Sequence, residues 1–322
     1  MTRAALIAAL LATFPLVAAT RAQYLMGTVC EIAADVPAEA AFAETARIES
    51  IISTWRDDSE LSRVNRGEQP SAELRALLEV ADAYVAKTGG AFNPHIRSLL
   101  NEWGIRRNEE GSGRVSRQPT TDSRQPDPSP TPAVGCRLPA VDTHASAPLS
   151  GSLDYEEGAF AKGYAIDRML DVLAKQGARN AVINFGGQIG TLTPITVTIA
   201  DPMHRDKPVV SLTLEKRSLS TSSGSEKTFM RDGRIYSHIV DPRTREALPP
   251  RGSVSVISDS ALEADILSTA LYVMGREQGL AWARAHNVIA IFIDNGSIEA
   301  SAAISGISVL DAHFRIRGVT NG

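Results

Sequence analysis

Residues 262–275, LEADILSTALYVMG, form a segment that is apolar on nearly every side at helical spacing. A helix of this kind is stable only when other elements cover it all round, so it must lie inside a core. The segment nevertheless holds Asp265 and Thr269, four residues apart and therefore about 40° apart around the helix axis. A buried carboxylate is costly unless it is paired, hydrogen-bonded or bound to a cation. The fold must therefore bring a polar partner to one side of a central helix.

Two interpretations of this pair follow from the sequence. In the structural one, Asp265 caps a neighbouring loop and Thr269 donates back to a carbonyl of its own helix. In the functional one, both oxygens bind a hard cation such as Mg²⁺, which takes oxygen ligands and typically combines one or two carboxylates with substrate phosphates.

Periodicity along the rest of the chain predicts a mixture of helices and strands without a strict strand–helix–strand alternation. This pattern favours an α+β fold over a doubly wound parallel sheet. Ser71 is the expected N-cap of one helix, which Gly89 and Gly90 end. We expect helices at 37–54, 71–88, 160–177, 260–274 and 276–286, and strands at 24–36, 180–185, 195–200, 208–214, 253–257 and 288–294.

The N-terminus has the layout of a secretory signal peptide, with one early arginine, an apolar run, and small residues near Ala19 and Ala22. The alternative is a membrane anchor, but a run of about 16 residues is short for a span. We expect residues 1–22 to be removed after Ala22 and residues 23–322 to form one exported domain. No later segment is long and apolar enough to cross a membrane, so no stable span is expected after cleavage.

Residues 107–150 are dense in proline, serine, arginine and aspartate and offer little to bury. They are expected to form a disordered surface insertion. The whole chain has 33 basic and 37 acidic residues, a net charge of −4, and no basic stripe. This balance argues against a nucleic-acid partner. The two cysteines, Cys30 and Cys136, lack metal-site spacing and are expected to be free thiols.

Three further segments could carry chemistry. The stretch EEGAFAKGYAIDR, residues 156–168, leads from a glycine-containing turn into a helix N-terminus, which favours anions, and Lys162 could add a charged contact. The stretch STSSGSEKTF, residues 220–229, offers hydroxyls, and YSHIVDPRT, residues 236–244, holds His238 as a proton carrier or a wall for a ring. The turn TGGAFNP, residues 88–94, could present Phe92 to a planar ligand. Taken singly, each segment also has an ordinary structural interpretation.

The order of these motifs is more specific than any one of them. The series MGT, STWRDDSELSRVN, GGAFNP, GAFAKGYAIDR, INFGG, TSSG, YSHIVDPRT and ADILSTALYVMG closely resembles the FAD:protein FMN transferase family, also called ApbE. The resemblance covers most of residues 24–295 outside the 107–150 insertion. It implies exported α+β proteins, related to the T-fold, with mixed and antiparallel sheets flanked by helices.

The resemblance also implies an activity: Mg²⁺-dependent transfer of FMN from FAD to a threonine or serine hydroxyl of a partner flavoprotein, with release of AMP. The implied partner is a periplasmic FMN-acceptor domain of an electron-transfer flavoprotein, and the implied location of this chain is the periplasm. The lipobox cysteine of many relatives is absent, so this chain is not a typical lipoprotein.

Site residues carry over position by position. The family's metal ligands match the carbonyl of Ala159, Asp265 and Thr269, and His238 matches the residue that accepts a proton or orients the flavin. The family usually has aspartate at the positions of Asn93 and Glu156, and GGDI in place of the GGQI that contains Gln188. The implied flavin and adenine contacts are Met26, Trp55, Ala91, Phe92, Asn93, Glu156, Lys162, His238 and Ile239.

Two other functions fit the same motifs. One is an FAD pyrophosphatase, in which water replaces the acceptor hydroxyl. The other is a non-catalytic flavin-binding module, which would bind flavin without releasing AMP; the Asp265 and Thr269 pair argues against it, because binding alone needs no metal at the bond that breaks.

Overall fold

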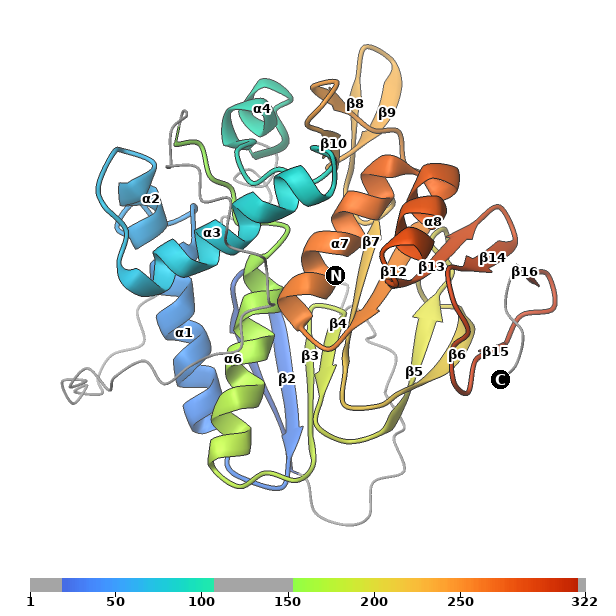
Figure 1. The fold of residues 1–322 in the computed structure, drawn as a ribbon, viewed down its shortest axis with the longest axis horizontal. Coiled ribbons are helices and arrows are strands. Elements are labelled where there is room, and N and C mark those ends of the chain that lie inside the picture. The colour runs from blue at the N-terminus through green and yellow to red at the C-terminus, as the bar shows by residue number, and fades with distance from the viewer. Residues whose placement is uncertain (1–18, 107–152, 318–322) are drawn as a thin grey trace, which may run out of the picture.

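The computed structural model describes residues 19–106 and 153–317 and has three layers (Figure 1). A nine-stranded sheet lies in the middle, helices cover one face, and a three-stranded sheet covers the other. The α+β prediction is therefore confirmed. The expected insertion at 107–150 and most of the expected signal peptide lie outside the described residues.

Neighbouring strands of the central sheet are antiparallel, except for the parallel pair β14 and β16. In spatial order the strands are β1 (Ala19–Leu25), β2 (Thr28–Ala34), β3 (Ala181–Phe185), β4 (Gln188–Thr191), β7 (Ser218–Ser223), β12 (Ser253–Ser258), β13 (Ile289–Asp294), β14 (Ser297–Ala300) and β16 (Arg315–Arg317). The second sheet has the order β15 (Ser308–Val309), β6 (Pro208–Leu214) and β5 (Ile195–Ala200), and two hairpins stand apart: β8 (Thr228–Arg231) with β9 (Arg234–Ser237), and β10 (Val240–Asp241) with β11 (Glu246–Ala247).

The helices include all five predicted ones and two short additions, α2 and α4, that the sequence patterns did not indicate. They are α1 (Glu39–Ile52), α2 (Glu60–Val64), α3 (Ala72–Lys87), α4 (Arg97–Glu102), α6 (Ala161–Lys175), α7 (Ala261–Met274) and α8 (Arg276–Ala285). Ser71 caps α3 by accepting the N–H of Leu74 at 3.3 Å, which confirms the expected N-cap. Within the described residues no helix combines the length and hydropathy needed to cross a membrane.

Alternation along the strands creates two cores, one on each face of the central sheet. On β12, Val254 and Val256 face the helical core while Ile257 belongs to the core shared with the three-stranded sheet. On β13, Phe292 faces the helical core and Ile291 faces the core shared with the three-stranded sheet. Successive side chains of a strand point to opposite faces, so a sheet covered on both sides is apolar at consecutive positions.

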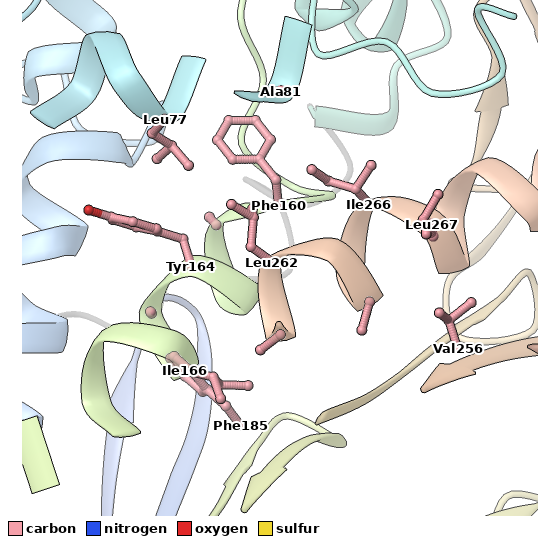
Figure 2. Close-up of a cluster of buried hydrophobic side chains, with 14 of the residues drawn as sticks. Leu77, Ala81, Phe160, Tyr164, Ile166, Phe185, Val256, Leu262, Ile266 and Leu267 are labelled. Atoms are coloured by element: carbon pink, nitrogen blue, oxygen red, sulfur yellow. The ribbon is translucent and has the colours of Figure 1, made fainter. Parts of the chain in front are cut away.

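α7 lies at the centre of the helical core, as its apolar sequence predicts. Figure 2 shows Leu262 and Ile266 of α7 meeting Phe160, which precedes α6, with Leu77 of α3 beside Phe160 and Ala81 of α3 above it. All five side chains are at most 2% exposed.

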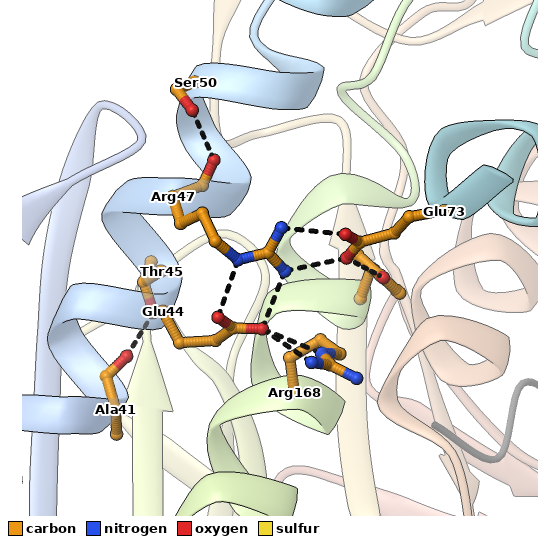
Figure 3. A network of polar contacts seen from close by, with 8 residues as sticks. Ala41, Glu44, Thr45, Arg47, Ser50, Glu73 and Arg168 are labelled. Carbon is orange, nitrogen blue, oxygen red and sulfur yellow. Dashed lines mark hydrogen bonds and ion pairs between the residues drawn. The ribbon is translucent and has the colours of Figure 1, made fainter. Parts of the chain in front are cut away.

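An ion-pair network joins three helices at the edge of this core (Figure 3). The Arg47 guanidinium of α1 donates to Glu44 on its own helix and to Glu73 on α3, at 2.7–2.8 Å. Glu44 also accepts from Arg168 of α6 at 2.9 Å. The Arg47 contact is the first cause that holds the pKa of Glu73 below its usual value. The network fixes α1 and α3 against α6.

Two details of the N-terminal region differ from the sequence prediction. The expected single strand at 24–36 is a hairpin, because Met26 and Gly27 adopt positive φ and turn the chain between β1 and β2. β1 also includes residues on both sides of the expected cleavage point after Ala22. Cys30 is a buried free thiol in β2, as expected, and burial raises its pKa to about 12, while Cys136 lies outside the described residues.

Gly163 of α6 permits the close crossing of α6 and α7. A Cβ atom at this position would lie 2.3 Å from the Ala261 carbonyl oxygen and 2.7 Å from the Cα of Leu262. Both obstacles are backbone, so they have little freedom to move away.

Gly163→Ala is therefore expected to destabilise the fold by about 1–3 kcal/mol or more, the usual cost of forcing extra atoms into a packed core. The measurement is the free energy of unfolding from urea denaturation. Gly158→Ala is the matched control, because a Cβ there meets nothing within 4 Å. Equal stability of the two variants would contradict the close crossing.

Candidate active site

Asp265 lies 5% exposed at the crossing of α6 and α7. Its Oδ2 accepts the backbone N–H of Gly163 at 3.0 Å, and its Oδ1 accepts from the Ser220 hydroxyl of β7 at 3.4 Å. Burial raises the pKa of Asp265, and the positive charge of Lys162 opposes this rise. Within the described residues the carboxylate has hydrogen bonds but no ion pair. The structure thus supplies polar partners without neutralising the charge by direct contact.

Thr269 and a row of hydroxyls continue the polar surface from Asp265. Thr269 Oγ1 donates to the Asp265 carbonyl oxygen and lies 3.3 Å from Ser222 Oγ. Ser222 Oγ is 2.9 Å from Ser268 Oγ, which in turn lies 3.3 Å from Ser220 Oγ. β7 places Ser220 and Ser222, two residues apart, on the face that meets α7. Carboxylate and hydroxyl oxygens therefore gather between one strand and one helix.

Both interpretations of the Asp265 and Thr269 pair have support in this geometry. The structural interpretation predicts a carboxylate that bonds a neighbouring segment and a threonine that donates to its own helix, and both hydrogen bonds are present. The donor set also suits a hard cation, because each carboxylate oxygen accepts one hydrogen bond and retains further lone pairs. The described residues contain no group of three or more His, Cys, Asp or Glu side chains arranged to hold a metal ion. A cation here would therefore have at most two carboxylate ligands from the described residues, with neutral oxygens completing its shell.

The start of α6 lies against Asp265. Phe160 is its N-cap and offers no side-chain acceptor, so the first-turn N–H groups are not capped by a side chain of that residue. Ala159 and Lys162 are half-buried on either side of this turn. The helix N-terminus and Lys162 both favour a negatively charged ligand beside the carboxylate.

Two consecutive buried carboxylates precede α6. Glu156 forms an ion pair with Arg106, and both side chains are 7% exposed. Thr54 Oγ1 donates to the carboxylates of Glu157 and Glu156 and accepts from Arg106 at 2.8 Å. Desolvation is the first cause that raises the pKa of both glutamates. One cation faces two carboxylates, so the cluster favours retention of one proton.

The 91–93 turn is fixed to this cluster. The Phe92 N–H donates to Thr88 Oγ1 at 3.1 Å, and Asn93 Oδ1 accepts the N–H of His95 at 2.9 Å. The Glu156 N–H donates to the Pro94 carbonyl at 2.8 Å. Ala91 and Phe92 are buried, whereas Asn93 is half-buried. The turn therefore lies directly beside the segment that leads into α6.

His238 lies at the foot of the β8–β9 hairpin. Its backbone N–H donates to the Lys227 carbonyl at 3.0 Å, and its Nδ1 lies 3.3 Å from the same oxygen. A carbonyl oxygen can only accept, so Nδ1 is the donor and the neutral ring has its lone pair on Nε2. The next residue, Ile239, is 8% exposed and belongs to the helical core.

Five of the twelve expected site residues lie in or against the helical core. Ala91, Phe92 and Ile239 belong to the helical core, and Met26 and Ala159 pack against it. Trp55 differs, since its side chain is 44% exposed and its ring lies under the Arg106 guanidinium.

Sequence reasoning missed Arg106 and Thr54, and it noted the hydroxyls of residues 220–229 without placing them beside Asp265. Arg106 borders a polar run and resembles the start of the insertion, so its burial has no local signature. The hydroxyls have a local signature, because Ser218, Ser220 and Ser222 alternate at strand spacing, although no strand was predicted there. Gln188, where the family usually has aspartate, donates to the Ala261 carbonyl at 2.9 Å and so supports the start of α7.

A separate cavity of about 350 Å³ lies between the end of α3 and helices α7 and α8. None of its lining residues is an expected site residue; they are Thr88, Gly89, Arg243, Met274, Gln278 and Trp282.

The fold and site together define an α+β protein that holds a buried carboxylate and hydroxyl against an anion-favouring helix start. The chain belongs to the ApbE family, whose model matches residues 26–293. It is 31% identical over 339 residues to the FAD:protein FMN transferase of Treponema pallidum (strain Nichols), with 92% of this chain and 90% of that protein covered.

Solved structures agree on the fold. The apo flavinyl transferase ApbE of Pseudomonas stutzeri is similar with a TM-score of 0.65 and 25% identity, covering 86% of this chain and 91% of that one. The ApbE protein of Thermotoga maritima has a TM-score of 0.69 at 23% identity, covering 88% and 96%. The family predicted from the motifs is confirmed.

The buried glutamate pair makes stability depend on pH. A carboxyl group whose pKa is raised by folding stabilises the folded state below its unfolded pKa, and this contribution is lost as the pH rises through the folded pKa. The wild type therefore loses stability as the pH rises from 5 to 9. The glutamine of Glu157→Gln stays neutral, so the unfolding free energy of this variant minus that of wild type is expected to increase over the same range.

Thermal unfolding across this pH range measures the effect. Glu215→Gln, at an exposed position, is the control and should show a flat difference from wild type. A difference for Glu157→Gln that shrinks with rising pH would show that burial does not raise this pKa.

Proposed function

We propose that this protein is an FAD:protein FMN transferase that requires Mg²⁺ and releases AMP. Membership of the ApbE family supports the flavin-transfer chemistry. The observation that carries the proposal is the position of Asp265 and Thr269 beside Lys162 and the N-terminus of α6. A pyrophosphate would meet favourable positive potential there, while the carboxylate requires a cation to lie beside an anionic substrate.

The reaction exchanges one phosphorus–oxygen bond for another. The hydroxyl oxygen of the acceptor threonine or serine attacks the phosphorus on the riboflavin side of FAD. The bond from that phosphorus to the bridging oxygen breaks, and AMP leaves with this oxygen. The hydroxyl proton passes to a base or to solvent. Such a reaction depends mainly on positioning and on neutralising charge.

Asp265, Thr269 and the carbonyl of Ala159 would hold the metal ion. When bound, Mg²⁺ supplies positive charge that polarises phosphoryl oxygens and stabilises a phosphate leaving group. Lys162 and the first turn of α6 contribute positive potential to the same place. The hydroxyls of Ser220 and Ser222 hold the side of α7 that carries both ligands.

In this proposal His238 accepts the proton of the attacking hydroxyl or orients the flavin. The Lys227 carbonyl fixes Nδ1 as the donor, which places the basic lone pair on Nε2. Met26, Trp55 and the 91–93 turn would contact the flavin or adenine ring. Trp55 offers a partly exposed aromatic face, and the turn offers buried Phe92 with half-buried Asn93.

The test of the function is covalent flavin. The purified protein is incubated with FAD, Mg²⁺ and a flavoprotein acceptor domain, and fluorescence is recorded on a denaturing gel together with AMP release. Fluorescent acceptor and stoichiometric AMP support the transferase. AMP without labelled acceptor identifies a pyrophosphatase, and bound flavin without AMP identifies a binding module.

The metal pair gives a sharper prediction. Asp265→Asn removes the charge that attracts Mg²⁺ and keeps the shape, so the transfer rate is expected to fall at least about a hundredfold, consistent with the several kcal/mol that metal ions contribute. Thr269→Val keeps the branched shape and removes one neutral oxygen, so the loss should be smaller.

The measurement is transfer rate against Mg²⁺ concentration for wild type and both variants, with melting temperature recorded alongside. A purely structural Asp265 predicts a lower melting temperature with an unchanged Mg²⁺ dependence. Normal rate and normal Mg²⁺ dependence in Asp265→Asn would end the metal-site proposal.

We also propose that the protein is exported and acts on a periplasmic acceptor domain, on the basis of the apolar N-terminal run. Cleavage after Ala22 would remove part of β1, the edge strand of the central sheet. The next strand inward, β2, would stay intact. Mass spectrometry of protein from a periplasmic extract is expected to show an N-terminus near Gln23. A membrane-bound protein that retains Met1 would contradict export.

A further inference from the structure

Arg106 covers one face of the exposed Trp55 ring. Its guanidinium carbon lies 4.2 Å from the ring centroid, within the range of a cation–π contact. The two side chains differ sharply in exposure: Arg106 is 7% exposed, whereas Trp55 is 44% exposed. A buried cation therefore supports an aromatic ring that remains accessible.

Three polar contacts of its nitrogens fix the guanidinium. NH1 donates to Thr54 Oγ1 at 2.8 Å and forms the ion pair with Glu156, and NH2 donates to the Thr54 carbonyl at 3.0 Å. Thr54 immediately precedes Trp55, so the Arg106 guanidinium contacts both the Trp55 ring and the backbone next to it. A planar fork can satisfy all of these contacts together, which a lysine ammonium cannot do.

A second arginine–tryptophan contact in the chain has different surroundings. Arg231 lies 4.7 Å from the Trp103 ring centroid, but its own side chain is 48% exposed. Trp103 also packs on Phe229 and Tyr236, and its Nε1 donates to the Arg245 carbonyl at 3.0 Å. Trp103 is therefore held by neighbouring rings and a hydrogen bond, and its arginine is peripheral.

We propose that Arg106 is a positioning residue for flavin transfer, which holds Trp55 as a stacking surface for a planar ring of FAD. The inference rests on the proposed function. An aromatic ring that is immobilised on one face and exposed on the other stacks a flat ligand with little loss of side-chain freedom. Arg106 acts through Trp55 and makes no contact with the reacting phosphorus, so it affects FAD binding and not the chemical step.

The experiment measures FAD affinity by quenching of tryptophan fluorescence in the full-length protein, with Trp55→Phe as the reference for the signal of that residue. Arg106→Lys keeps the charge and loses the fork. It is expected to raise the Kd and KM for FAD about tenfold, within the usual strength of a partly desolvated cation–π contact, and to leave kcat at saturating FAD within about twofold of wild type. Arg231→Lys is the matched control and should leave the Kd unchanged.

A double-variant cycle separates positioning from general destabilisation. If Arg106 acts through Trp55, adding Arg106→Lys to Trp55→Phe causes little further loss of FAD affinity. Titrations with FMN and with AMP show which ring stacks, because only the fragment that contacts Trp55 should lose affinity in Arg106→Lys.

An unchanged FAD Kd in Arg106→Lys, or losses that simply add in the double variant, would overturn the inference. In either case a wild-type protein that labels its acceptor keeps the proposed function intact. A wild-type protein that neither binds FAD nor transfers FMN would overturn both.

Discussion

The crossing of α6 and α7 is the contact on which the rest of the structure depends. Each helix supplies a carboxylate to the start of the other: Asp265 of α7 accepts the N–H of Gly163, and Asp167 of α6 accepts the N–H groups of Ala261 and Leu262 at 2.7 and 3.0 Å. These reciprocal caps satisfy backbone donors that a helix start leaves open and that burial would otherwise make costly. Because the crossing also lacks a Cβ at Gly163, the two helix starts approach each other closely.

Under the proposed function, Asp265 has two tasks. Its hydrogen bond to Gly163 orients the carboxylate, and the buried carboxylate would bind the cation. The structural and the functional interpretations of this residue are compatible, since a ligand that is already held by the fold needs little reorganisation when a metal ion binds. The hydroxyls of β7 restrain the same face of α7 from the other side. The central sheet thus contributes to the site without supplying a charge.

The sequence was most informative where one local pattern decides the outcome. The all-round apolar segment at 262–275 predicted a central helix, and strands β5 and β6 have the predicted bounds. Prediction failed where distant contacts decide. The turn at Met26 interrupts a continuous β-like run, and Arg106 is buried only because Thr54 and Glu156 come to it from elsewhere in the chain. The helix pattern singled out Asp265 and Thr269, but the contacts of Ser220 and Ser222 with them became visible only once β7 was placed beside α7.

The pairing of Arg106 with Glu156 has a consequence for the length of chain between them. These residues stand on either side of a long stretch of chain, and Asp154 adds hydrogen bonds to Arg97 and Ser98 across the same junction. The ion pair and the hydrogen bonds join the two sides of the junction directly. Chain can therefore be inserted or deleted between them without moving Arg106 or Glu156. Loop-closure entropy grows by only about 0.6 kcal/mol for each doubling of length. The protein therefore has a position where a change in chain length costs little folding free energy.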